Sequence, residues 1–138
     1  MLYQRIAPNA PLLTYLGPRP FAAVVAIEEN VDPEWQWQMS KWLVESGCLY
    51  MMAWGIDCSS WDDSVDYANL EIYNYGDIPK DKHVMTTWHD TQPLEEVFDF
   101  AKRHARPMSD EIQIRETIVF HVACVDRQEQ YERLFAAA

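Results

Sequence analysis

The residues best suited to chemistry lie in the stretch WGIDCSSWDDSVDYANLE, residues 54–71, which holds acidic, thiol and hydroxyl groups and no basic residue. Carboxylates can bind cations or act as general acids and bases, and a thiol can act as a nucleophile. The same stretch also has the pattern of a helix start. Ser60 is followed three positions later by Asp63, as in a capping box, and Asp62 would lie at the positive end of the helix dipole. We therefore expect most of this stretch to be structural, with Ser60 as the N-cap and Asp66 on the solvent side.

Other polar groups follow the apolar segments and would meet at one edge of a parallel sheet. They are Glu28, Glu29, Asp57, Cys58, His89, Asp90 and Asp126. Ligands of open parallel sheets bind beyond the carboxyl ends of the strands. Carboxylates gathered there would suit Mg²⁺, with Glu28, Glu29 and Asp57 as the ligands. Phosphotransfer receivers also need an aspartate at the end of the third strand and a later lysine, and here Trp88 and His89 end that strand and no lysine follows the fourth.

A nucleophilic pair of Cys58 and His89 is another option at this edge. In the strand order predicted below, one strand lies between the two residues, which separates them by roughly 10 Å. We therefore expect Cys58 to be unreactive and His89 to be a loop histidine near a helix start. His121 falls in the middle of an apolar run, and we expect it to be a hydrogen-bonded core histidine.

Known catalytic and nucleotide-binding motifs are absent. The four glycines form neither GxGxxG nor GxxxxGK[ST], and the chain has no HExxH, GxSxG or CxxC. Three widely spaced cysteines argue against a disulfide scaffold and fit a reducing compartment. The sequence predicts no cofactor and favours a protein that is not an enzyme.

The elements that must position these residues alternate along the chain. Continuous apolar runs such as FAAVVAI predict buried strands, and amphipathic segments between them predict helices. The predicted strands are 21–27, 48–54, 83–89 and 117–124, and the predicted helices are 31–47, 59–76, 90–105 and 126–135. Segment 107–116 fits either a loop or an extension of the fourth strand.

This alternation predicts an α/β fold with a small doubly wound, mostly parallel sheet and helices on both faces. We expect four strands in the flavodoxin-like order 2-1-3-4, with strand 21–27 in the centre. The length of 138 residues suits a single domain, 1–138. The proline-rich segment 1–20 is too apolar to float free, and we expect it to pack on a sheet edge or a helix as an N-terminal arm.

Charge narrows the range of partners. The net charge is −11, and between residues 20 and 79 eleven acidic residues face a single basic one, Lys41. This field repels phosphate backbones, so we expect no nucleic-acid binding, and it attracts a basic protein surface or a cation. Excess acid could equally serve only to keep a tryptophan-rich protein soluble. No apolar run reaches the roughly 20 residues of a membrane span, and the N-terminus is a poor signal peptide, so we expect a cytoplasmic protein without membrane contact.

One tryptophan stands out in the first predicted helix. At about 100° per residue, Trp37 lies about 200° from Trp35, which shares the inward face with Met39. A doubly wound fold buries only one face of such a helix. We favour Trp37 lying under the N-terminal arm; the alternative is an exposed anchor for a partner, since tryptophan is enriched at interface hot spots.

The segments WLVESGCLYMMAWGIDCSSWDDSVDYANLE and HVMTTWHDTQPLEEVF resemble a bacterial family of small proteins that is classed as a domain of unknown function. The likeness spans roughly residues 20 to 105. It implies a bacterial, cytoplasmic single domain. It supplies no activity, so no catalytic residue is carried over from it.

Together these observations favour a small acidic, cytoplasmic protein-binding module, of the immunity or antitoxin kind that neutralises a basic partner. Its expected binding residues are Trp37, Asp57, Asp62, Asp63, Asp66, His89 and Asp90. The alternative is a small Mg²⁺-dependent enzyme or phosphotransfer-like module that uses the acidic rim at the carboxyl ends of the strands.

Overall fold

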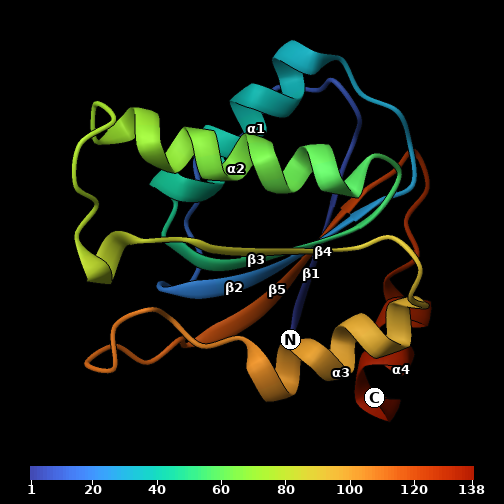
Figure 1. Cartoon of the computed structure of the whole chain (residues 1–138). Helices are drawn as coiled ribbons and strands as arrows, with labels where there is room; N and C mark the ends of the chain where they lie inside the picture. The colour runs from blue at the N-terminus through green and yellow to red at the C-terminus, as the bar shows by residue number, and fades with distance from the viewer.

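Strands and helices alternate along the chain in the computed structural model, which describes residues 1–138 (Figure 1). The strands are β1 (Leu2–Ile6), β2 (Phe21–Ile27), β3 (Cys48–Gly55), β4 (Met85–His89) and β5 (Glu116–Val122). The helices are α1 (Pro33–Glu45), α2 (Cys58–Ile72), α3 (Leu94–His104) and α4 (Gln128–Ala137), with a short 3₁₀ turn at Lys80–Lys82. No helix combines the length and the apolar character needed to cross a membrane.

The strands form one sheet in which every pairing is parallel. The predicted parallel sheet is confirmed, with 21–27 in the centre and all seven residues of β2 buried. The predicted strand number and order are wrong, because the sheet has five strands in the order β1-β5-β2-β3-β4. The strand at 83–89 pairs with β3 instead of β2, and β5 takes the place beside β2.

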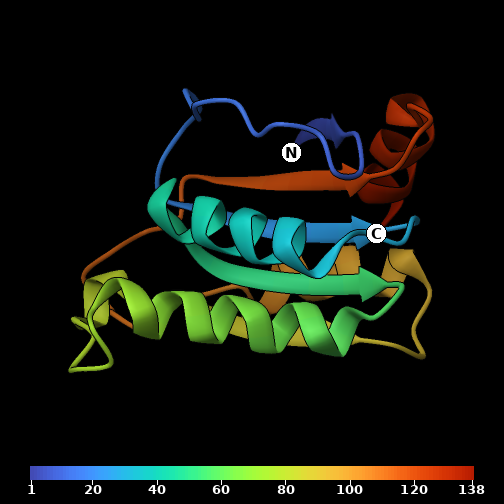
Figure 2. The ribbon, with the colours of Figure 1, turned by 90° about the horizontal axis from the view of Figure 1, so that it is seen from above.

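The placement of the helices explains this order. Helices α1 and α2 cover one face of the sheet, and α3 and α4 cover the other (Figures 1 and 2). Right-handed crossovers through α1 and α2 carry the chain from β2 to β3 and then to β4. Because α3 lies on the opposite face, the next right-handed crossover runs back across the sheet and places β5 on the other side of β2. The strand order therefore reverses between β2 and β5.

The first twenty residues contact both the sheet and α1. Residues 2–6 form β1, an edge strand that pairs with β5 and was not predicted. The remainder of the arm crosses α1, where the indole N–H of Trp35 donates to the carbonyl of Ala10 (2.6 Å). The indole N–H of Trp42 donates to the carbonyl of Leu13 (2.8 Å).

The turn after β3 requires a glycine. Gly55 has φ +100°, and a Cβ at this position would lie 2.1 Å from the carbonyl oxygen of Ile27. Any other residue would therefore clash with the backbone of β2. The next backbone N–H, of Ile56, donates to that same carbonyl (2.9 Å), which holds the carboxyl ends of β2 and β3 together.

Helix α2 begins earlier than predicted, and the assignment of Ser60 as the N-cap is wrong. Asp57 occupies the cap in a left-handed conformation (φ +53°), and its carbonyl already accepts from the N–H groups of Ser60 (2.9 Å) and Trp61 (3.3 Å). Ser60 is inside the first turn, where its hydroxyl donates to the Asp57 carbonyl (2.9 Å). The helix also ends at Ile72, before the predicted Gly76.

Candidate functional site

One stripe of α2 faces the edge strand β4. Near the C-terminal end of α2, this stripe attaches the helix to the segment before β4. The Asn69 side chain accepts from the N–H of Val84 (2.9 Å) and donates to the carbonyl of Lys82 (3.3 Å). One turn earlier on the helix, the hydroxyl of Thr86 donates to Oδ1 of Asp66 (2.7 Å). Asn69 and Asp66 therefore hold α2 against the first half of β4.

Asp62, another turn back along the same stripe, is the least satisfied polar residue here. It is only 6% exposed, and its Oδ2 has no hydrogen-bond partner. Burial raises the pKa of Asp62 to about 6, and the neighbouring Asp66 carboxylate adds to this rise. Burial also raises the pKa of Asp66. Two carboxylates in one partly buried site, with Thr86 as the only hydroxyl donor between them, form a site suited to a positively charged group.

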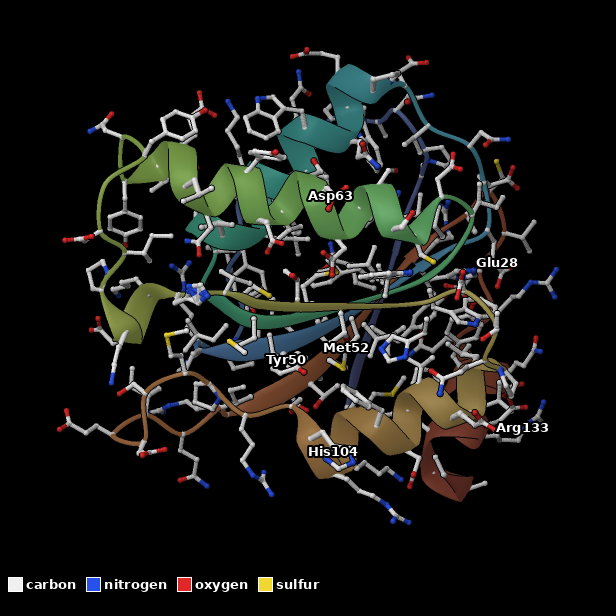
Figure 3. All side chains as sticks on the ribbon, viewed as in Figure 1. Glu28, Tyr50, Met52, Asp63, His104 and Arg133 are labelled. Carbon is white, nitrogen blue, oxygen red and sulfur yellow. The ribbon has the colours of Figure 1, made fainter.

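One exposed aromatic residue, Trp88, flanks these carboxylates. Trp88 follows Thr86 by two positions, so both side chains lie on the α2 side of β4. Trp88 is 52% exposed. Tyr67 on α2 is also exposed, but it shares a stripe with Ser60 and Ser64, which face α1. Figure 3 labels Asp63 on α2, above β4, and this residue is exposed. We call this surface the α2–β4 patch; its members are Asp62, Asp63, Asp66, Trp88 and Asp90.

The structure does not gather the other predicted binding residues on this patch. His89 is buried on the opposite face of the sheet, where its ring contacts Phe100 and bonds with Thr87 (2.9 Å) and Gln92. Asp57 is exposed at the N-cap of α2. Trp37 is half-buried on α1, with the ammonium of Lys41 5.6 Å from its ring centre. Helix α1 lies beside α2 on the same face of the sheet, and Trp37 is therefore not part of the β4 edge (Figure 2).

The predicted separation of Cys58 and His89 is also wrong, because their strands are neighbours. Burial raises the pKa of the Cys58 thiol, and this thiol lies near the backbone of His89. Cys58 nevertheless belongs to the core under α1 and α2, whereas the His89 ring is on the other face. The two side chains therefore do not form a nucleophilic pair.

The residues proposed for a metal site do not converge. No group of three His, Cys, Asp or Glu side chains is placed to hold a metal ion. Glu28 instead accepts a hydrogen bond from the hydroxyl of Tyr131, and its Oε1 lies 3.2 Å from Nε2 of His121. Glu29 and Asp57 take no part in this contact. The geometry gives no support to a Mg²⁺ site formed by Glu28, Glu29 and Asp57.

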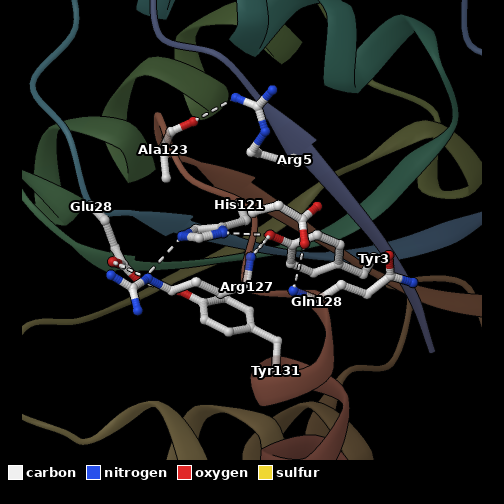
Figure 4. Close-up of polar contacts among 9 residues, drawn as sticks. Tyr3, Arg5, Glu28, His121, Ala123, Arg127, Gln128 and Tyr131 are labelled. Carbon is white, nitrogen blue, oxygen red and sulfur yellow. Dashed lines mark hydrogen bonds and ion pairs between the residues drawn. The ribbon is translucent and has the colours of Figure 1, made fainter.

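A polar network at the reversal of strand order was only partly visible in the sequence (Figure 4). His121 is fully buried, as expected of a core histidine, and its Nδ1 lies 2.6 Å from the hydroxyl of Tyr3. That hydroxyl accepts from the backbone N–H of Arg127 (3.0 Å). Because the Glu28 carboxylate beside Nε2 can only accept, the proton of the neutral imidazole belongs on Nε2, and Nδ1 accepts from the Tyr3 hydroxyl. Nε2 then carries the imidazole proton and faces Glu28. We call these residues the Glu28–His121 network; they are Tyr3, Glu28, His121, Arg127 and Tyr131.

The network has the order carboxylate, imidazole and hydroxyl found in catalytic triads, but its contacts are those of a network that stabilises the fold. Burial lowers the pKa of His121 and raises those of Tyr3 and Tyr131, so all three are held neutral. Each hydroxyl is already engaged within the network. Of the network residues, Tyr3 lines a groove beside β1 and Arg127 lines one at the start of α4, whereas Glu28, His121 and Tyr131 line none of these cavities.

A cavity of about 540 Å³ lies at the opposite ends of the strands and was not predicted. Its wall combines apolar residues such as Val44 and Leu49 with the charged groups of Arg19, Glu45 and Lys82. These residues are scattered along the sequence, and only the fold brings them together. Charges of both signs line the wall, so the cavity selects no ligand class.

The fold and the patch together define a parallel α/β protein with an acidic and aromatic surface at one sheet edge. The chain belongs to the family described as Domain of unknown function (DUF7684), whose model matches residues 1–138. The family match is therefore longer than the resemblance seen in residues 20 to 105. Neither a curated protein nor a solved structure matches the chain.

Proposed function

We propose that the protein is a protein-binding module whose α2–β4 patch docks a basic surface of another protein. The observation that carries this proposal is the coincidence of an exposed aromatic side chain, Trp88, with exposed acids at a sheet edge. Aromatic residues supply buried contact area in interfaces, and the surrounding acids select and steer a basic partner. Trp88 replaces Trp37 as the proposed anchor, since Trp37 is half-buried and remote from β4.

The kind of partner follows from charge. A net charge of −11 gives a protein of 138 residues a strong negative field, which accelerates encounter with cationic proteins. Nucleic-acid-binding proteins and toxins that attack nucleic acids carry such basic surfaces. We propose a role of the immunity or antitoxin kind, in which the patch masks the basic surface of an effector.

Binding kinetics test this proposal. The partner is recovered by affinity capture on the wild-type chain, and its association is followed by stopped-flow fluorescence at several salt concentrations. Asp63→Asn combined with Asp90→Asn removes two exposed charges from the patch, and we expect association to slow by about tenfold with a weaker salt dependence. Trp88→Ala should instead speed dissociation, because it removes the anchor.

The control removes the same number of charges elsewhere. Glu95→Gln with Glu96→Gln alters two exposed acids at the start of α3, on the opposite face of the sheet. This variant should associate at close to the wild-type rate. Equal slowing in both variants would mean that only net charge matters and would contradict docking at the patch.

A further inference from the structure

The proposed function leaves open how a partner contacts the patch, and the β4 edge supplies an answer. β4 pairs only with β3, so the backbone N–H and C=O groups on its outer side have no strand partner. In Figure 1, β4 runs between α2 and α3 with no other segment drawn in front of it. Its edge is open along the length of the strand.

Apart from its short length of five residues, the β4 edge also lacks the features that usually prevent a sheet edge from pairing. Proline, lysine, bulges and covering loops serve this purpose in natural sheets. The sequence of β4, MTTWH, contains neither proline nor lysine, and its pairing with β3 runs without a register shift. The opposite edge, β1, differs because it carries Arg5 and has residues 13–17 of the arm beside it.

The spacing of the two carboxylates matches the repeat of a strand. Asp62 and Asp66 are one helical turn apart, which places them about 6 Å apart along α2. Side chains on one face of a strand repeat every two residues, or about 6.6 Å. A strand beside β4 would therefore present two side chains, at positions i and i+2, to Asp62 and Asp66. Its intervening side chain would lie on the other face, beside the half-buried Phe100.

We propose that an extended basic segment of the partner adds to β4 as a sixth strand, with lysine or arginine at i and i+2 over Asp66 and Asp62. This inference rests on the proposed function and specifies its binding mode. The added strand pairs the open backbone groups of β4, and its cations supply the donor that the buried Oδ2 of Asp62 lacks. An apolar residue at i+1 suits the face near Phe100. The recognition pattern is thus basic, apolar, basic.

A second copy of the chain fits this edge less well. In a two-fold dimer the same patch meets itself, which would bring Asp62 and Asp66 of both copies to one site. Each copy carries a net charge of −11, so this pairing is repulsive. A basic segment has the complementary charge.

The test uses a defined probe, the blocked and fluorescently labelled peptide Thr-Lys-Val-Lys-Val-Lys-Thr. Anisotropy titration against the wild-type chain should show saturable binding. Asp62→Asn combined with Asp66→Asn should weaken it at least tenfold, whereas Glu95→Gln with Glu96→Gln should change it less than twofold. Circular dichroism of each variant checks that the fold is retained.

The backbone requirement is tested separately. A peptide with N-methyl groups at alternate residues, placed in turn on either edge, keeps its charge but loses the N–H donors of one edge. One of the two methylated peptides should bind at least tenfold more weakly than the parent. Amide exchange measured by NMR should slow at least fivefold for outward N–H groups between Thr86 and Trp88 when the parent peptide binds.

Three outcomes would overturn strand addition. They are no saturable binding of the parent peptide, equal binding of both methylated peptides, and β4 amides protected by dimerisation of the chain alone. None of them touches the kinetic test with Asp63 and Asp90, so the proposed function would stand if that test succeeded. Failure of the kinetic test would instead remove the basis of both proposals.

Discussion

Two groups of buried polar side chains in this protein differ in one respect, the charge that faces the unbonded atom. In the Glu28–His121 network, Nε2 of His121 lacks a well-formed hydrogen bond but lies 3.2 Å from the Glu28 carboxylate. In the α2–β4 patch, the unbonded Oδ2 belongs to Asp62, and the nearest charged group is the like-charged Asp66. The unbonded atom therefore faces an opposite charge in the Glu28–His121 network and a like charge in the α2–β4 patch.

This difference distinguishes a structural cluster from the proposed binding surface. Buried polar groups that satisfy one another make the core unique and rigid. A buried group without a partner destabilises the free protein and gains that energy back when a ligand supplies the missing contact. The Glu28–His121 network ties β1, β2, β5 and α4 together, whereas the proposed partner of the patch would supply the contact that Asp62 lacks.

The largest expected effect comes from breaking the network. His121→Leu removes the acceptor of the Tyr3 hydroxyl and the imidazole that faces Glu28. We expect a loss of about 3 kcal/mol in the free energy of unfolding, measured by urea denaturation, because the fully buried imidazole and its two half-buried partners, Tyr3 and Glu28, lose their contacts. A loss below about 1 kcal/mol would show that the network does not hold the sheet to α4.

The α2–β4 patch and the Glu28–His121 network should also differ in how folding stability depends on pH. The pKa of Asp62 is raised in the folded protein to about 6, above the unfolded value of about 4, so the folded state holds the proton more tightly. The contribution of Asp62 to the free energy of unfolding therefore falls as pH rises from about 4 to 6 and is constant above that range. Asp62→Asn should remove this slope, with a relative gain of about 1–2 kcal/mol between pH 4 and 7, because solvent at the rim partly screens the pair.

The network has the opposite pH dependence. Burial lowers the pKa of His121 below its usual value of about 6.5, so the folded state holds this proton less tightly than the unfolded state. The contribution of His121 to the free energy of unfolding therefore rises with pH up to about 6.5 and is lost as pH falls below that value. Thermal melts of Asp62→Asn between pH 4 and 7 should reveal this rising limb, set against the falling contribution that remains from Asp66, whose pKa burial also raises. A falling limb that persists in the variant would assign it to a group other than Asp62.

A smaller effect is expected where only one hydrogen bond is removed from the network. Tyr131→Phe keeps the ring against Phe98 and His121 but deletes the hydroxyl that donates to Glu28. We expect a loss of about 1 kcal/mol in guanidinium denaturation, since Glu28 remains partly open to solvent. A loss as large as that of His121→Leu would make Glu28, and not His121, the centre of the network.

The smallest change in folding stability is expected for an exposed side chain that belongs to neither group. Ser60 is partnered but exposed, with its hydroxyl bonded to the Asp57 carbonyl and to the Gln36 amide. Ser60→Ala should change stability by less than about 0.5 kcal/mol, because water replaces both contacts. A loss of 1 kcal/mol or more in denaturant midpoint would restore a capping role for this serine.

Much of the fold could be predicted because short apolar and amphipathic segments of the sequence determine where its strands and helices form. The continuous apolar runs at 21–27 and 48–54 form fully or largely buried parallel strands, as such runs do when helices cover both faces. The strand order could not be predicted in the same way. The apolar face of α3 looks the same whichever side of the sheet it covers, and that choice places β5. β1 was missed because LYQRI is short and partly exposed, and its partner lies at the far end of the sequence.

The site followed the same rule. The acids of α2 were identified from the sequence, but Asp62 was expected at the exposed start of a helix. Its burial depends on β4 lying beside β3, which the predicted order excluded. Trp88 was expected only as the end of a strand, and its exposure at a free edge depends on the same neighbour. A lone aromatic within a polar edge strand, TTWH, was the available signal.

The position of β5 between β1 and β2 has a consequence for how the protein acquires its structure during synthesis. Phe21–Ile27 and Leu2–Ile6 both pair with residues 116–122, so the two earliest strands cannot join until most of the chain has left the ribosome. The β2-β3-β4 half, with α1 and α2, is made first and winds in one direction from local crossovers. Until β5 arrives, β2 is itself an open edge made entirely of apolar residues. The nascent chain is therefore most prone to aggregation late in translation, when the β2 edge is exposed and the strand that covers it is still unmade.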